Sequence, residues 1–169
     1  KEIMVTYCTV CRTGRVYEPK VGGKLENFRL VGMDNFNAMF EDQTTKSWWR
    51  QANGEAIMGP LKGTLLPELP AQQMSLAMWL KLYPKSKIMQ PDPAFKEAYD
   101  STGKYESGKS KSELTGTDSL SWKIKSWIVG IEINHKSIAI DWNRLKRERI
   151  VQLELSNTPF VLVLAKDNK

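Results

Sequence analysis

Short apolar segments separated by glycine, proline and asparagine constrain the fold of this chain more than any other feature. The segments "IMVTYC" and "WIVGIEI" are rich in β-branched and aromatic residues, and turn-forming residues follow each of them. Such segments are typical of β-strands, in which every second side chain faces the same side of a sheet. We therefore predict an α+β domain dominated by β-strands, built as a mixed sheet or a barrel-like sheet with few short helices.

One segment has helical periodicity instead. Residues 70–84, "PAQQMSLAMWLKLYP", place Met74, Met78 and Leu82 at helical spacing between two prolines. We predict a helix over residues 72–82, with the two methionines at core positions. A second short helix is expected at residues 143–150, "NRLKRERI", between two pairs of strands. The last of these pairs is expected to turn at residues 157–159.

The length of the chain sets its domain organisation. A chain of 169 residues is long enough for one domain with a substantial core, and we treat residues 1–169 as a single domain. Residues 90–121 are rich in Ser, Gly, Lys and Asp, so we expect a long surface loop there. No apolar run approaches the roughly 18 residues of a membrane-spanning helix, so we expect none in this chain.

The net charge of +6 raises the question of a polyanionic partner. The one compact basic run is "RLKRER", residues 144–149, and Glu148 interrupts it, while the other basic residues are spread along the chain. This distribution is typical of a solvated helix face, so we expect no nucleic-acid partner.

Both cysteines of the chain, Cys8 and Cys11, lie in the segment "TYCTVCRTG". In thioredoxin-type sites a helix N-terminus lowers the thiol pKa, but here a strand is expected, as in the knuckle of a zinc ribbon. The chain has one histidine, His135, so four zinc ligands would require carboxylates or a second subunit. Two thiolates with a methionine would suit Cu(I). We rank a disulfide or free dithiol first, a Zn or Cu site second and a nucleophilic cysteine third.

A second chemically rich stretch covers residues 39–66, "MFEDQTTKSWWRQANGEAIMGPLKGTLL". Its polar and aromatic side chains are either turn caps in a β-rich core or the wall of a binding pocket, and composition favours neither alternative. The pocket candidates are Asn37, Asp42, Thr45, Ser47, Trp49 and Gln51. We predict that the two cysteine sulfurs lie close together at the end of a strand, next to residues 42–51.

The order of these motifs resembles a bacterial family of domains of unknown function. The family is marked by a "TYCPLCG"-like strand, a D-x-x-T-x-S-x-W-x-Q segment, a G-x-A-x-x-G-P-L-x-G loop and a W-x-x-x-x-P helix. Besides the cysteines, the matching positions are Gly32, Asp42, Thr45, Ser47, Trp49, Gln51, Gly54, Ala56, Gly59, Pro60, Leu61, Gly63, Leu65, Trp79 and Pro84. Thr9 and Arg12 stand where the family usually has Pro and Gly, which weakens the zinc-knuckle analogy.

The resemblance implies a cellular setting and a larger protein. Members of the family are commonly exported, so it implies an extracytoplasmic location, periplasmic or in the cell envelope. In the family a hairpin, a short helix and a strand lead into the cysteines, and residues 128–165 have the same order here. The chain is therefore expected to lack an N-terminal strand–helix–strand unit.

We expect a binding or structural module of the cell envelope, a subunit of a larger assembly with protein partners, whose cysteine pair lies near a polar, tryptophan-bearing pocket. The alternative is a thiol-redox or metal-dependent enzyme that uses Cys8 and Cys11. The sequence offers no clear general base, so it leaves open whether the chain is an enzyme. In an oxidising compartment the two thiols are expected to form a disulfide or to hold a metal.

Overall fold

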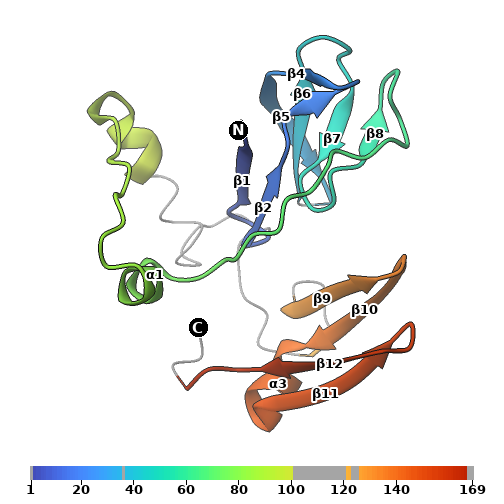
Figure 1. The fold of residues 1–169 in the computed structure, drawn as a ribbon, viewed down its shortest axis with the longest axis vertical. Helices are drawn as coiled ribbons and strands as arrows, with labels where there is room; N and C mark the ends of the chain where they lie inside the picture. The colour runs from blue at the N-terminus through green and yellow to red at the C-terminus, as the bar shows by residue number, and fades with distance from the viewer. Residues whose placement is uncertain (1, 36, 101–120, 123–125, 167–169) are drawn as a thin grey trace. The chain divides into compact units, whose positions relative to one another are not determined.

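The computed structural model describes residues 2–35, 37–100, 121–122 and 126–166 (Figure 1). Strands dominate and the helices are short, so the predicted β-dominated α+β class is confirmed. Within the described residues the strands form several small antiparallel sheets and no closed barrel. The chain divides into two compact units, one of Lys1–Gln73 with Lys87–Lys109 and one of Met74–Ser86 with Ser110–Lys169. Each unit is described by itself.

The first unit begins with the hairpin that carries the cysteines. Strands β1 (Met4–Cys8) and β2 (Thr13–Tyr17) pair antiparallel, so the predicted strand before the cysteines is present. Side chains alternate along β1: Thr6 and Cys8 are buried, and the residues between and before them are more exposed. A small hairpin follows, formed by β3 (Lys20–Val21) and β4 (Lys24–Leu25).

A four-stranded antiparallel sheet holds most of the second rich stretch, residues 39–66. Its strands, in the order in which they pair, are β5 (Phe28–Asp34), β6 (Asn37–Asp42), β7 (Trp48–Arg50) and β8 (Ala56–Met58). Strand β5 continues through Gly32, and its register against β6 shifts between Leu30 and Gly32. A glycine tolerates such a bulge because it has no side chain to misplace. The buried core of this unit consists of Tyr17, Trp49, Ala56 and Leu66.

The second unit contains two hairpins and a helix. Strands β9 (Ile128–Ile133) and β10 (Lys136–Asp141) form the first hairpin, and β11 (Ile150–Leu155) and β12 (Thr158–Val163) form the second. Helix α3 (Trp142–Glu148) lies between them in sequence, and its buried Leu145 packs in one core cluster with Val151 and Leu164.

Two predicted boundaries in this unit need correction. The turn predicted at residues 157–159 falls at Ser156 and Asn157, both of which have positive φ, as a tight two-residue hairpin turn requires. Pro159 therefore lies inside β12 rather than in the turn. The predicted helix at 143–150 ends at Glu148 because Ile150 begins β11.

The helix predicted at residues 72–82 is present but shorter. Helix α1 (Leu76–Leu82) begins after Ser75, whose side chain accepts a hydrogen bond from the backbone N–H of Met78. None of its residues is buried, so the core position predicted for Met78 is wrong, and Met74 before the helix is only half-buried.

The described part of the predicted loop at 90–121 is not wholly irregular. It contains a 3-10 turn, η1 (Pro93–Phe95), and helical residues 96–100. The rest of the predicted loop, residues 101–120, lies outside the described residues. In the described portions of the chain no helix is both long and apolar enough to cross a membrane.

Candidate functional site

The cysteine pair sits where β1 turns into β2. Cys8 is the last residue of β1 and is buried, whereas Cys11 in the turn is exposed. Their Sγ atoms are 2.9 Å apart, and the backbone N–H of Cys11 donates to Cys8 Sγ over 3.4 Å. The prediction that the two sulfurs lie close together at a strand end is confirmed. Both residues are thiols in the structure, and the disulfide and metal-bound states stay predictions.

The Gln73 side chain forms hydrogen bonds with the backbone of this hairpin. Its Oε1 accepts a hydrogen bond from the N–H of Gly14 over 2.6 Å, and its Nε2 donates to the carbonyl of Arg12 over 2.9 Å. Just before it in sequence, the N–H of Leu69 donates to the carbonyl of Val16. The segment that follows β8 therefore covers the edge of β2, first by main-chain bonds and then by a side-chain amide. Residues 69–73 therefore fix the position of the turn that carries Cys11.

A side-chain amide supports the cysteines from the inside. Asn37, the first residue of β6, donates from its Nδ2 to Cys11 Sγ over 3.4 Å and to Gln51 Oε1 over 2.9 Å. Its Oδ1 accepts a hydrogen bond from the N–H of Ala52 over 2.8 Å. These bonds fix the orientation of the Asn37 amide, so a donor is aimed at the sulfur before any ligand arrives.

Gln51 continues this network back to the cysteine hairpin. Its side chain is fully buried, and its Nε2 donates to Thr6 Oγ1 over 3.1 Å and to the carbonyl of Thr13 over 2.9 Å. Its backbone carbonyl accepts the hydroxyl of the buried Tyr17 over 2.8 Å. Because buried amides are costly when unpaired, this network ties β1, β2, β6 and the end of β7 into one arrangement.

The environment of Cys11 makes its thiol reluctant to ionise. Desolvation, followed by the hydrogen bond with Cys8, raises the pKa of Cys11 to about 11, although the amide of Asn37 opposes the shift. At neutral pH the exposed sulfur is therefore protonated. Since the thiolate is the nucleophile, this state disfavours Cys11 as the attacking group of an exchange enzyme.

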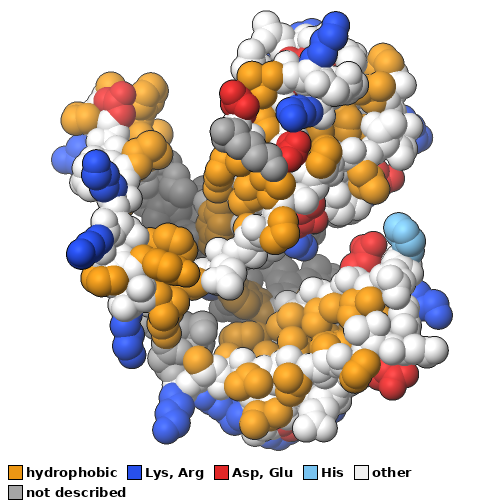
Figure 2. All heavy atoms as spheres, in the orientation of Figure 1, with side chains coloured by type: hydrophobic (Ala, Val, Ile, Leu, Met, Phe, Trp, Pro, Cys, Tyr) orange, Lys and Arg blue, Asp and Glu red, His pale blue; other side chains and the backbone are white. Residues whose placement is uncertain are grey.

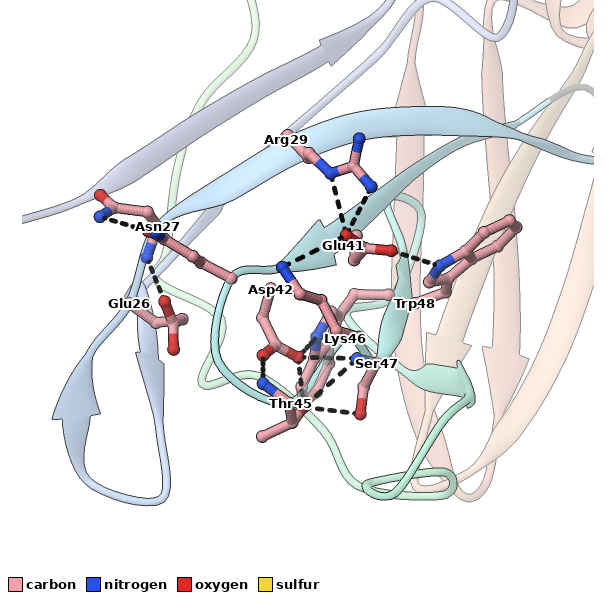
Figure 3. Close-up of polar contacts among 11 residues, drawn as sticks. Glu26, Asn27, Arg29, Glu41, Asp42, Thr45, Lys46, Ser47 and Trp48 are labelled. Carbon is pink, nitrogen blue, oxygen red and sulfur yellow. Dashed lines mark hydrogen bonds and ion pairs between the residues drawn. The ribbon is translucent and has the colours of Figure 1, made fainter.

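A second polar cluster surrounds Asp42 at the end of β6 (Figure 3). The buried carboxylate accepts hydrogen bonds from the N–H of Thr45 (2.5 Å), the hydroxyl of Thr45 (2.6 Å), the N–H of Ser47 (3.1 Å) and the indole N–H of Trp49 (3.0 Å). Ser47 Oγ lies 2.8 Å from the Thr45 hydroxyl and accepts the N–H of Leu61. These contacts are those of a capped turn that is pinned to the following loop.

The two clusters lie at opposite ends of the same strands. Asn37 begins β6 and Asp42 ends it, and five residues of extended chain cover about 16 Å. The structure therefore brings Asn37 to Cys11 and Gln51 to the hairpin that carries the cysteines, and it keeps Asp42, Thr45 and Ser47 away from them. Trp49 lies between the clusters, in the core, with its ring edge-on to that of Phe28. The pocket role of these residues stays a prediction.

An ion pair beside the Asp42 cluster was missed in the sequence. Arg29 donates to Glu41 Oε1 over 2.7 Å, and the indole of Trp48 donates to Glu41 Oε2 over 3.0 Å (Figure 3). The guanidinium and then the indole hold the pKa of Glu41 below its ordinary value. Arg29 and Glu41 are cross-strand partners, so only the strand register could have revealed this pair.

In the described structure, no further His, Asp or Glu ligands cluster with the two cysteine sulfurs to form a metal site. Among the described residues there is no group of three or more His, Cys, Asp or Glu side chains that could hold a metal ion. His135 lies in the turn between β9 and β10, where its φ is 59°. A metal at Cys8 and Cys11 would thus be held by two thiolates from these residues, which suits a soft ion.

Fold and site together define a class of β-dominated protein in which a two-thiol knuckle rests on a buried amide network. The family model described as "Protein of unknown function (DUF3179)" matches residues 1–169. The chain belongs to this family, so the resemblance seen in the sequence is confirmed. No curated protein and no solved structure matches the chain.

The Asp42 cluster makes stability depend on acid pH. Burial tends to raise the pKa of Asp42, but the hydrogen bonds from Thr45, Trp49 and Ser47 outweigh it and hold the pKa below the ordinary 3.8. A carboxylate with a lowered folded-state pKa binds fewer protons when folded, so its contribution is present above about pH 4 and is lost below. We expect the free energy of unfolding to fall as pH drops below about 4. Urea unfolding of the parent and of Asp42→Asn should show a shallower decline in the variant, and equal slopes would contradict the assignment.

Proposed function

We propose that the chain is an extracytoplasmic binding or structural module of the cell envelope, whose working site is the Cys8–Cys11 pair. The observation that carries this proposal is the 2.9 Å separation of the sulfurs on a turn that Asn37 supports from inside and Gln73 from outside. Such a prearranged pair can be linked to each other or to one soft ion with little reorganisation of the chain. The export of family members supports the extracytoplasmic setting, where thiols pair or bind metal.

A binding role agrees better with the site than a catalytic role. The groups placed on the sulfurs include an amide and a backbone N–H, which donate hydrogen bonds and remove no proton. A catalytic cysteine needs a low pKa or an adjacent base, and the pKa of Cys11 is raised. The buried amides also stabilise one geometry of the knuckle, as a site that holds a ligand or a cross-link requires.

The alternative is a thiol-redox or metal-dependent enzyme, and one feature favours it. Cys11 is exposed while Cys8 is buried, so an external thiol or disulfide can reach one sulfur of the pair. Cys11 would attack the external disulfide to form a mixed disulfide and release one thiol, and Cys8 would then attack the mixed disulfide, close the internal disulfide and release the second thiol. A small disulfide would serve as the oxidant in this reaction.

Thiol titration and elemental analysis of the native protein test the proposal. We expect protein purified without reductant to show fewer than two titratable thiols and to show two after reduction or chelation, with Zn or Cu appearing only in the metal-bound case. The Cys8→Ser, Cys11→Ser variant, which should show no thiol and no bound metal, is the matched control. Two freely titrating thiols in metal-free native protein would contradict the proposal.

The same double variant is expected to keep its fold. A cross-link between Cys8 and Cys11 closes a very short loop, so by loop entropy it stabilises the protein by only about 2 kcal/mol. The hydrogen bonds of Gln51 and Gln73 hold the hairpin without the sulfurs. Thermal melting should show one cooperative transition with a modestly lower midpoint, and loss of that transition would show that the pair is a structural staple.

A further inference from the structure

Helix α1 and the residues after it present apolar side chains that nothing in the described structure buries. Leu76, Met78, Trp79, Leu82 and Tyr83 are each between 38% and 55% exposed, and no residue of the helix is buried. In Figure 2 apolar side chains gather where Figure 1 places α1, with lysine side chains beside them. We call these five side chains the α1 surface. Contiguous exposed apolar patches of this kind mark interaction sites.

Helix α1 is too short to be stable in water unless its apolar side chains pack against another surface. It has seven residues, and isolated helices shorter than about 12 residues are marginal in water. Its capping bond from Ser75 helps its start but buries no apolar area. A partner that covers the α1 surface would therefore stabilise the helix by burying its apolar side chains.

The charge around the α1 surface indicates what kind of partner fits. Between Glu68 and Asp92 the sequence has no acidic residue, and its charged residues there are Lys81, Lys85 and Lys87. A surface that is apolar and only positively charged complements a surface that is apolar and negatively charged. A bilayer of anionic phospholipid has both properties.

The aromatic residues fit the same partner. The rings of Trp79 and Tyr83 stack with centroids 4.5 Å apart, and the indole N–H of Trp79 donates to Ser86 Oγ over 2.9 Å. Trp and Tyr are enriched at the membrane–water interface because each has an apolar body and a polar end. A seven-residue helix is only about 10 Å long, so it can lie in the interface but cannot span the bilayer.

We propose that the α1 surface, with Lys81 and Lys85, binds the chain peripherally to a bilayer of anionic phospholipid. Leu76, Trp79 and Leu82 enter the headgroup region, and the two lysines contact lipid phosphates. This proposal goes beyond the function of the cysteine pair and does not depend on it, because a two-thiol site can be correct in a protein that binds no lipid.

Vesicle sedimentation at low salt tests the proposal. We expect the parent to sediment with vesicles of mixed phosphatidylcholine and phosphatidylglycerol, to sediment far less with phosphatidylcholine alone, and to be released at about 0.5 M salt. Lys81→Glu with Lys85→Glu should weaken binding at least about tenfold, since each basic residue near an anionic surface contributes about fivefold. Trp79→Ala with Leu82→Ala should weaken binding at every salt concentration.

The control is Lys24→Glu with Lys62→Glu, which changes the net charge equally at two exposed lysines outside the α1 surface. It should bind nearly as the parent does. Equal loss of binding in the control, equal binding to neutral vesicles, or no sedimentation of the parent would overturn the proposal. If the parent self-associates instead and Trp79→Ala with Leu82→Ala abolishes this, the α1 surface belongs to a protein interface and the lipid proposal is wrong.

Discussion

Replacing Asp42 by alanine is expected to lower the free energy of unfolding by about 3–5 kcal/mol. The carboxylate is fully buried and accepts four hydrogen bonds, including those of the Thr45 hydroxyl and the Trp49 indole. Without it, these donors remain buried and lose their acceptor, and each unsatisfied buried donor costs about 1–3 kcal/mol. The loss is large because Asp42 joins the turn after β6, the start of β7 and the core tryptophan.

Urea unfolding followed by tryptophan fluorescence and circular dichroism measures this loss. Asp92→Ala is the matched control, because the Asp92 carboxylate also accepts a nearby backbone N–H, that of Ala94, but is exposed at the start of η1. Capping contributes about 1 kcal/mol in such positions, so the control should change stability little. Asp42→Asn should fall between the two, since it keeps the shape and one acceptor oxygen. A loss below about 1 kcal/mol for Asp42→Ala would show that the cluster is not structural.

These contacts explain which parts of the site could be predicted from the sequence. The spacing of Asp42, Thr45 and Ser47 is local, and it predicted turn capping as one of two alternatives. Asn37 contacts Cys11, and Gln51 contacts the cysteine hairpin, only because β6 and β7 pair antiparallel and return to the same end of the sheet. Gln73 contacts a backbone 59 residues away, and no local pattern encodes that distance.

The same division between local and distant information applies to the fold. Hairpins such as β9–β10 were predictable because apolar alternation and an Asn-His turn act over a few residues. The sequence does not predict the turn at Ser156 and Asn157, because proline favours turns, although an edge strand also tolerates it and Pro159 lies in β12. The periodicity of α1 identified its apolar positions but could not say whether another part of the chain covers them.

Gly59→Ala is expected to be the second most damaging of the substitutions considered. Gly59 has φ 93°, a conformation that alanine adopts only with strain, and an added Cβ would lie 2.7 Å from the Cα of Ser47. That neighbour is backbone, so it cannot rotate away, and Ser47 is itself fixed by Asp42. Strain and overpacking together predict a loss of about 3 kcal/mol in urea unfolding.

Gly63→Ala separates the two causes. Gly63 lies in the same loop with φ 88°, but no atom lies within 4 Å of the Cβ that alanine would add. It should therefore show the cost of strain alone, about 1–2 kcal/mol, and remain more stable than Gly59→Ala. The clash at Gly59 also pushes on Ser47 Oγ, so combining Gly59→Ala with Asp42→Asn should cost less than the sum of the two changes. Additive losses, or equal losses at the two glycines, would show that the loop does not pack on the Asp42 cluster as the contacts indicate.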